Sequence, residues 1–124
     1  MTLEELYSQI GGDYAEAIER MRKEELVSRF IVRFLDDDSC ANMLASWEAG
    51  DDEAAFNAAH TAKGLCANLA ITSLSGIATV LTEALRPGND SLRASTDIDG
   101  LMAQFNEAYQ HAVSCIKAYA EERA

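Results

Sequence analysis

The strongest constraint on the fold is a long apolar repeat near the end of the chain. From about Asp97 or Asp99 almost to the last residue, apolar side chains recur at alternating steps of four and three, at Leu101, Phe105, Ala108, Ala112, Cys115 and Tyr119. An α-helix has 3.6 residues per turn, so this spacing places these side chains on one stripe of a helix. Such a stripe is stable only when other helices cover it, and the repeat therefore predicts a helical bundle.

Capping residues predict two short helices at the start of the chain. Thr2-x-x-Glu5 and Asp13-x-x-Glu16 both have the spacing at which side chains close the first turn of a helix, and the first helix is expected to end at Gly11-Gly12. From about Lys23, apolar residues again recur every three or four positions until the acidic run 36–38 interrupts them. A third helix is expected there.

Three further helices are predicted before the final one is reached. Ser39 is expected to cap a helix that stops at Gly50, and Asp51 to cap the next. That next helix carries an apolar seam at Ala55, Ala59, Ala62, Cys66 and Leu69. A brief turn is predicted at Thr72-Ser73, followed by a helix that Pro87-Gly88-Asn89-Asp90 ends.

No segment has the alternating pattern of a strand, and the predicted fold class is all-α. The arrangement we expect is an antiparallel four-helix bundle with one or two short additional N-terminal helices. At 124 residues the chain has the size of one domain. We expect a single helical domain over residues 1–124, with lead-in helices in 1–22 and the bundle in 23–122.

Composition limits the class of partner. The chain has 21 acidic and 10 basic residues and a formal net charge of -11, which opposes broad attraction to nucleic acid or to anionic membranes. A protein partner or a small anion fits this charge better. The chain start lacks the features of a signal peptide, and no run approaches the roughly 18 apolar residues of a membrane span, so a cytoplasmic location is expected. The cysteines lack metal-type spacing and are expected to be reduced core residues.

Three residues of the helix after Asp51 combine a nucleophile, a cation and a bare turn. His60, Lys63 and Gly64 stand at positions i, i+3 and i+4, which are neighbours on a helix surface. Glycine inside a helix is about 1 kcal/mol less favourable than alanine, so Gly64 indicates either close approach of another molecule or close packing of two helices. Residues 54–82 include no Asp or Glu, so we expect that an anion can dock there without meeting a carboxylate.

These residue types suit phosphoryl transfer. A neutral imidazole, with an ordinary pKa of about 6.5, has a free ring nitrogen at physiological pH that can attack phosphorus. Catalysis of the transfer depends mainly on alignment and on positive charge near the phosphoryl oxygens. We therefore predict that His60 accepts a phosphoryl group and that Lys63 stabilises it.

The segment from His60 to Leu69, HTAKGLCANL, resembles the signature of the histidine-containing phosphotransfer (HPt) domains of two-component signalling. That signature runs H-x-x-K-G, then a small and an apolar residue before a second glycine, where this chain has Ala70. Upstream, Gly12-Asp13-Tyr14, the stretch 30–35 and Gly50-Asp51 are similar in order to the lead-in helices of free-standing members. We expect Ala70 to be a modest change at a helix end.

The resemblance implies a phosphorelay carrier rather than an enzyme. It implies that a receiver domain supplies the acceptor aspartate, the Mg²⁺ and most of the catalytic power, and docks around His60 on Phe56, Asn57, Gly64, Leu65 and Ala67. The implied partners are response-regulator receiver domains and a hybrid histidine kinase. The chain itself is expected to bind no cofactor or metal and, because its seam is used internally, to be a monomer.

Other interpretations compete with the carrier. A helical adaptor that binds a receiver or kinase without being phosphorylated has the same fold, whereas a self-sufficient kinase needs a phosphate-binding glycine loop that the sequence lacks. His111, with Glu107 one turn earlier, has the spacing of half a metal site, but a di-iron bundle needs a second such motif and further glutamates. We assign His111 to the surface or the bundle edge. The run Asp36-Asp37-Asp38 is assigned to a solvated helix end, since a calcium loop needs alternating ligands.

Overall fold

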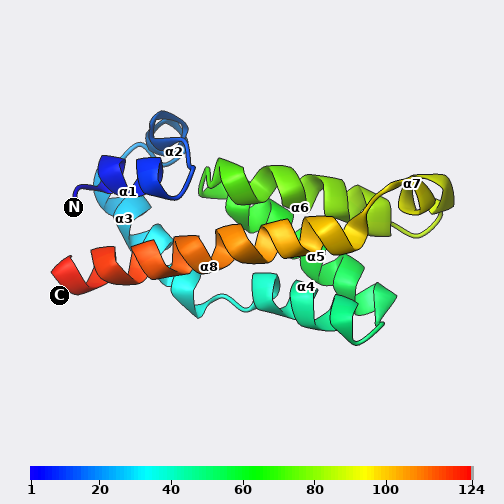
Figure 1. Ribbon diagram of the computed structural model, residues 1–124. Helices are drawn as coiled ribbons and strands as arrows, with labels where there is room; N and C mark the ends of the chain where they lie inside the picture. The colour runs from blue at the N-terminus through cyan, green and yellow to red at the C-terminus, as the bar shows by residue number, and fades with distance from the viewer. Residues whose placement is uncertain (124) are drawn as a thin grey trace.

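A computed structural model describes residues 1–123, which form helices and short connections (Figure 1). In chain order the elements are α1 (Leu3–Gln9), α2 (Tyr14–Met21), α3 (Glu24–Arg33), the 3-10 helix η1 (Phe34–Asp36), α4 (Ser39–Glu48), α5 (Asp52–Asn68), α6 (Thr72–Leu85), α7 (Asp90–Ser95) and α8 (Ile98–Arg123). Residues 1–123 contain no strand, so the all-α prediction is confirmed.

Helices α4, α5, α6 and α8 form the bundle. A short turn joins α5 to α6, and the two pack along each other as a hairpin. α4 packs along α5, while α8 packs along α6. Figure 1 shows α8 running along the bundle and on past its end. The predicted four-helix bundle is therefore confirmed.

Helices α1, α2 and α3 gather at one end of the bundle, beside the C-terminal part of α8 (Figure 1). α1 buries Leu3, Leu6 and Tyr7 there. The hydroxyl groups of Ser28 in α3 and Tyr119 in α8 lie 2.7 Å apart and form a buried hydrogen bond. α1 and α2 are the predicted lead-in helices, and α3 packs with α2 and α8 at the same end.

The predicted apolar seams are buried to different extents. All five seam residues of α5 are buried. In α8 the predicted positions Phe105, Ala112 and Tyr119 are buried, but Leu101, Ala108 and Cys115 are only half-buried, and the core is completed by Ile98, Met102 and Ile116. The buried stripe therefore runs through residues 98, 102, 105, 112, 116 and 119, and the half-buried Leu101 and Cys115 lie one residue away from it, about 100° around the helix axis from Met102 and Ile116.

Most helix ends follow the capping residues. Asp51 accepts a hydrogen bond from the Ala54 amide at 3.1 Å, and the predicted caps at Thr2 and Asp13 also close their first turns. The prediction that Ser39 caps α4 is wrong by one position: Ser39 is the first helical residue, and its amide donates to Asp37. The prediction of a turn at Thr72-Ser73 is also wrong, because these residues already belong to α6.

The turn between α5 and α6 is a close helix termination centred on Ala70. Ala70 has a φ of 55°, in the left-handed region that favours glycine. The amides of Ala70 and Ile71 donate to the carbonyls of Ala67 and Cys66, which is the Schellman pattern of helix ends. The left-handed φ explains why the HPt signature has a glycine at this position. Alanine keeps the same turn at a cost of about 1 kcal/mol.

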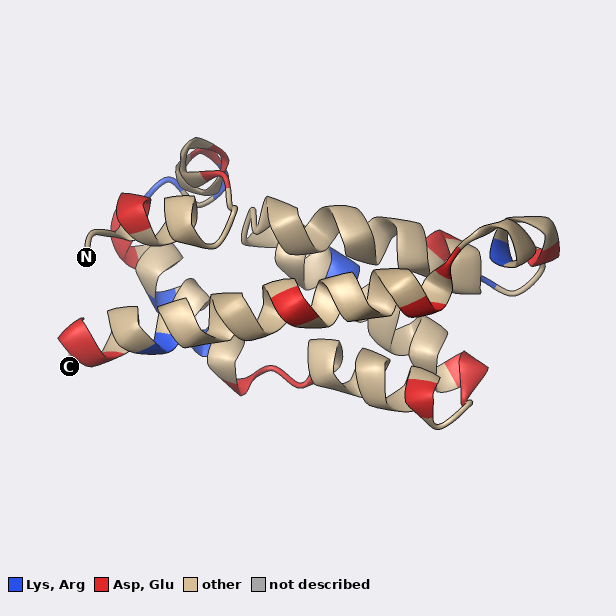
Figure 2. Cartoon of the chain, viewed as in Figure 1, with Lys and Arg blue, Asp and Glu red and all other residues tan. Residues whose placement is uncertain are grey.

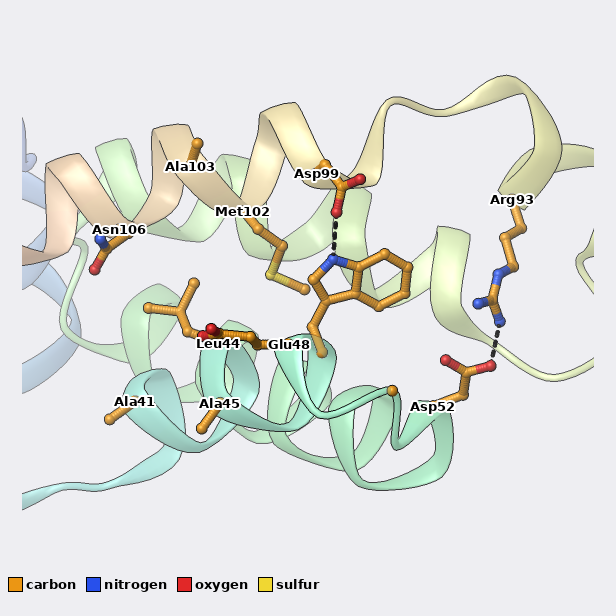
Figure 3. A pocket seen from close by; sticks show the side chains of 12 residues that line it. Ala41, Leu44, Ala45, Glu48, Asp52, Arg93, Asp99, Met102, Ala103 and Asn106 are labelled. Atoms are coloured by element: carbon orange, nitrogen blue, oxygen red, sulfur yellow. Dashed lines mark hydrogen bonds and ion pairs between the residues drawn. The ribbon is translucent and has the colours of Figure 1, made fainter.

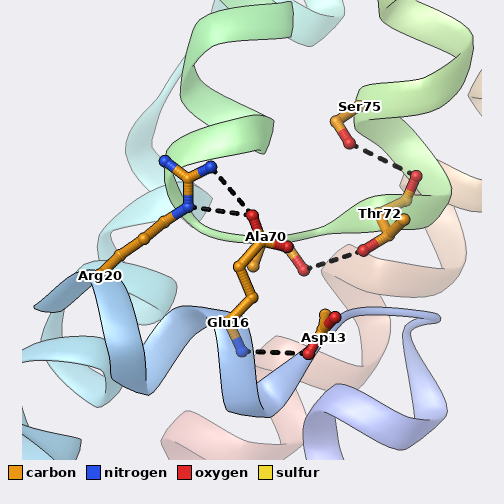
Figure 4. A network of polar contacts seen from close by, with 6 residues as sticks. All are labelled: Asp13, Glu16, Arg20, Ala70, Thr72 and Ser75. Carbon is orange, nitrogen blue, oxygen red and sulfur yellow. Dashed lines mark hydrogen bonds and ion pairs between the residues drawn. The ribbon is translucent and has the colours of Figure 1, made fainter. Parts of the chain in front are cut away.

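The connection between α1 and α2 is held against this turn. The Tyr7 hydroxyl donates to the Leu69 carbonyl at 2.7 Å, and the Asp13 amide donates to the Ala70 carbonyl at 2.9 Å. Figure 4 shows Asp13 and the start of α2 beside Ala70, with Thr72 donating to the same carbonyl. Because Leu69 and Ala70 end the helix that carries His60, the lead-in helices fix one end of the candidate site.

Two further sequence expectations can be compared with residues 1–123. Within that range no helix combines the length and apolar character needed to cross a membrane. The three cysteines are free thiols, with Cys40 and Cys66 buried and Cys115 half-buried, as expected for core residues. Cys40 lies beside Cys66, and its proximity together with burial raises the pKa of the Cys66 thiol. The Cys66 thiol therefore remains a protonated core side chain.

Candidate functional site

The site lies on the outer face of α5. His60 is exposed, Lys63 is half-buried and Gly64 is exposed, so the three residues share one strip of the helix as their spacing predicts. Among the described residues, no ion pair engages the Lys63 ammonium. The neighbouring α6 is uncharged along most of its length (Figure 2). The strip thus presents a nucleophile, His60, and a cation, Lys63, on a largely uncharged surface.

The His60 ring lies next to the aromatic ring of Phe56. Phe56, one turn earlier on α5, has its ring centre 6.2 Å from that of His60, with the planes inclined by 32°. The hydrogen bonds among residues 1–123 leave both His60 ring nitrogens unengaged, whereas Nε2 of His111 has a partner. An exposed ring with unengaged nitrogens can present one of them to a partner.

Gly64 faces open space. A Cβ atom built on Gly64 has no neighbouring atom within 4 Å apart from its own helix backbone. Close packing of two helices therefore does not explain this glycine. The remaining interpretation is that Gly64 leaves room for another molecule next to His60.

α6 brings two charged residues to the site that the sequence pattern did not place there. The guanidinium carbon of Arg86 lies 5.2 Å from the centre of the Phe56 ring, and Arg86 Nε donates to Glu83 Oε2 at 2.7 Å. That hydrogen bond lowers the pKa of Glu83, and the charge of Lys63 lowers it further. Glu83 therefore lies close to the strip.

The expectation that an anion meets no carboxylate at the site is wrong for this reason. The sequence window 54–82 has no acid, but α6 folds back along α5 and brings Glu83 near enough for the charge of Lys63 to act on it. The charge of Glu83 is offset by its ion pair with Arg86. The sequence shows only that these two residues are three positions apart at the end of α6, which says nothing about their distance from α5.

The other residues of the predicted docking surface surround the strip. Phe56 and Ala67 are half-buried and Asn57 is exposed. Leu65 packs partly against the core and is five positions from His60, about 140° around the helix axis. It lies on a flank of the strip rather than on it.

The second histidine is not part of this site. His111 is exposed on α8, and its Nε2 lies 2.9 Å from the Gln9 carbonyl oxygen and 3.7 Å from the Cys115 sulfur. Its assignment to the surface is confirmed. Within residues 1–123, no three His, Cys, Asp or Glu side chains are grouped as metal ligands would be.

Comparison with protein families agrees with the geometry. The model of the Hpt domain family matches residues 5–114, which include α5, α6 and all the site residues described above. A search of curated proteins and a search of solved structures each found no match. The family match covers most of the 124 residues and includes the exposed histidine, the lysine one turn later and the bare glycine. The chain therefore belongs to the Hpt domain family, the histidine phosphotransfer carriers of two-component signalling.

Proposed function

We propose that His60 accepts a phosphoryl group from the phosphorylated aspartate of one receiver domain and passes it to a second response regulator. The observation that carries this proposal is the exposed imidazole with Lys63 and the bare Gly64 on the same strip of α5. Family membership supports the carrier chemistry, and the geometry supports the assignment to His60 rather than His111.

The chemical step uses the free lone pair of the neutral ring. A ring nitrogen of His60 attacks phosphorus, a P–N bond forms, and the P–O bond to the aspartate breaks, so that the aspartate leaves as a carboxylate. The other ring nitrogen keeps its proton during the attack. The reverse step on a second receiver regenerates the imidazole. No redox change occurs, and the Mg²⁺ that assists the step belongs to the receiver domain.

Lys63 supplies the positive charge on this chain. It lies one turn from His60, half-buried and without an ion pair among the described residues, so its ammonium is available to the phosphoryl oxygens. The ion pair of Glu83 with Arg86 limits the attraction between Glu83 and Lys63. Lys63 thereby remains the unpaired counter-charge for a phosphoryl group on His60 among the described residues.

The receiver docks on the surface around the strip. Gly64 and the small Ala67 permit close approach, while Phe56 and Asn57 extend the contact by one turn and Leu65 borders it. A donor of the same kind, the receiver domain of a hybrid histidine kinase, fits the same surface. The chain acts in this proposal as a monomer that binds one receiver at a time.

The experiment is a transfer assay with a receiver domain carrying labelled phosphate in the presence of Mg²⁺. The chain should acquire label that is labile in acid and stable in alkali, as a phosphohistidine is. His60→Gln should abolish this label, while His111→Gln, the matched control, should keep it. A chain that binds the receiver but never acquires label is an adaptor, and that result would overturn the proposal.

A further inference from the structure

One side of the bundle is open. α4 packs closely along α5 but has only slight contact with α8. Between α4 and α8 lies a groove of about 870 Å³. Its walls carry small residues, Ala41 and Ala45 from α4 and Ala103 from α8, all of them exposed (Figure 3). The groove exists because these positions carry no side chain long enough to fill it.

The apolar part of the groove is built around Trp47. Its indole Nε1 donates to Asp99 at 2.7 Å, which holds the ring between α4 and α8 (Figure 3). Leu44, which is half-buried, and Met102, which is buried, also line the groove. A fixed, half-buried indole beside apolar side chains favours contact with apolar side chains of another molecule.

The charged part of the groove is acidic. Glu48, Asp52 and Asp99 line it, and the single lining cation is Arg93. Arg93 is paired with Asp52 at 2.9 Å and lies 5.6 Å from the centre of the Trp47 ring, so its charge is already compensated. Acidic segments also gather around the connection from α4 to α5 (Figure 2). The groove therefore favours a ligand that is both basic and apolar.

We propose that this groove binds an amphipathic, lysine- and arginine-rich helix of a partner protein. Apolar side chains of that helix rest on Trp47, Leu44 and Met102, while its basic side chains pair with Glu48 and Asp99. A helix suits the site because the groove runs between two helices and is open along one side, the geometry in which an amphipathic helix binds. Charge complementarity with a chain of net charge -11 identifies the partner as basic.

This site is separate from the phosphotransfer site. The groove is lined mainly by α4 and α8, whereas His60 is on α5 beside α6. The two surfaces adjoin only at the start of α5, where Asp52 of the groove lies one turn before Phe56 of the docking surface. The groove gives the carrier a means of attachment to a second protein.

The test uses the fluorescence of Trp47, which is the single tryptophan of the chain. The probe is a synthetic helical peptide of leucine and lysine without aromatic residues, with leucines spaced along one face. Its addition should change the emission saturably, and added salt should weaken binding. Ala45→Lys and Ala103→Lys, on opposite walls, should each weaken binding about tenfold by filling the groove and adding positive charge.

Two controls make the test decisive. Ala118→Lys adds the same charge at an exposed position of α8, outside the groove. Along the helix axis it lies about 18 Å from Asn106, the groove residue of α8 nearest to it in sequence. This variant should bind the peptide like the unmodified chain. A peptide with glutamate in place of lysine should leave the emission unchanged.

Three results would overturn the proposal. The first is an unchanged emission with the leucine–lysine peptide, and the second is equal binding to the Ala45→Lys, Ala103→Lys and Ala118→Lys variants. The third is a Trp47 emission that changes with the concentration of the chain when no peptide is present. That result would assign the groove to a second copy of this chain. Circular dichroism of each variant shows whether its helices are retained, and the two groove variants provide independent readings.

Discussion

Substitution of Gly64 should change the stability of the chain and its phosphotransfer rate in opposite directions. Gly64 lies inside α5 with open space around the position of a Cβ atom, so a side chain there meets nothing in the free protein. Glycine is about 1 kcal/mol less favourable than alanine inside a helix, so Gly64→Ala should stabilise the chain by about that amount. For a domain of this size, that corresponds to a rise in Tm of about 4 °C.

The same change should slow phosphotransfer. A side chain at position 64 occupies the space that the proposed docking leaves to the receiver next to His60. A displacement of about 1 Å at the reacting atoms costs about 100-fold in rate, so Gly64→Leu should lower the transfer rate by about 10- to 100-fold and Gly64→Ala by less. The measurements are thermal unfolding by circular dichroism and the rate of label transfer from a phosphorylated receiver.

The matched control is Ala118→Leu, which adds a leucine at an exposed position of α8. It should transfer phosphate at the rate of the unmodified chain. Normal transfer by Gly64→Leu would refute the docking role of the strip. A loss of stability in Gly64→Ala would refute the statement that this glycine faces open space.

Three other changes test the charge, the turn and a helix cap. Lys63→Ala should slow transfer about tenfold and Lys63→Arg should restore most of the rate, both with an unchanged Tm. Tyr7→Phe leaves the Leu69 carbonyl without its donor and should cost about 2 kcal/mol in urea unfolding. Burial raises the pKa of Tyr7 above its ordinary value of 10.0. The contribution of Tyr7 to folding stability is therefore fully present below pH 10 and is lost as the pH rises above 10. In that alkaline range Tyr7→Phe should lose stability less steeply than the unmodified chain. Asp51→Ala removes the cap of α5 and should cost about 1 kcal/mol by the same unfolding measurement.

The helices that sequence reasoning located best are those with both a capping residue and an apolar stripe. α5 has Asp51 at its start and a seam that is buried throughout, so its position and its inward face were predictable. α7 was not predicted, because it has no buried residue and hence no apolar repeat. It follows Pro87-Gly88, which indicates only that a helix has ended.

Contacts between helices could not be predicted in the same way. The strip of His60, Lys63 and Gly64 depends only on the 3.6-residue period of one helix and was predictable. The approach of Arg86 to Phe56 and of Glu83 to Lys63 depends on how α6 is rotated against α5. Local spacing contains no information about that rotation, so this part of the site required the structure.

The most direct test of the central claim is an NMR spectrum of the imidazole groups before and after addition of a phosphorylated receiver with Mg²⁺. The chain has two histidines, so each gives a separate set of signals. We predict that the ring signals of His60 move to the positions of a phosphohistidine while those of His111 keep theirs. Phosphorylation signals on His111, or none on either ring while the receiver loses its phosphate, would contradict the assignment of His60 as the phosphoryl acceptor.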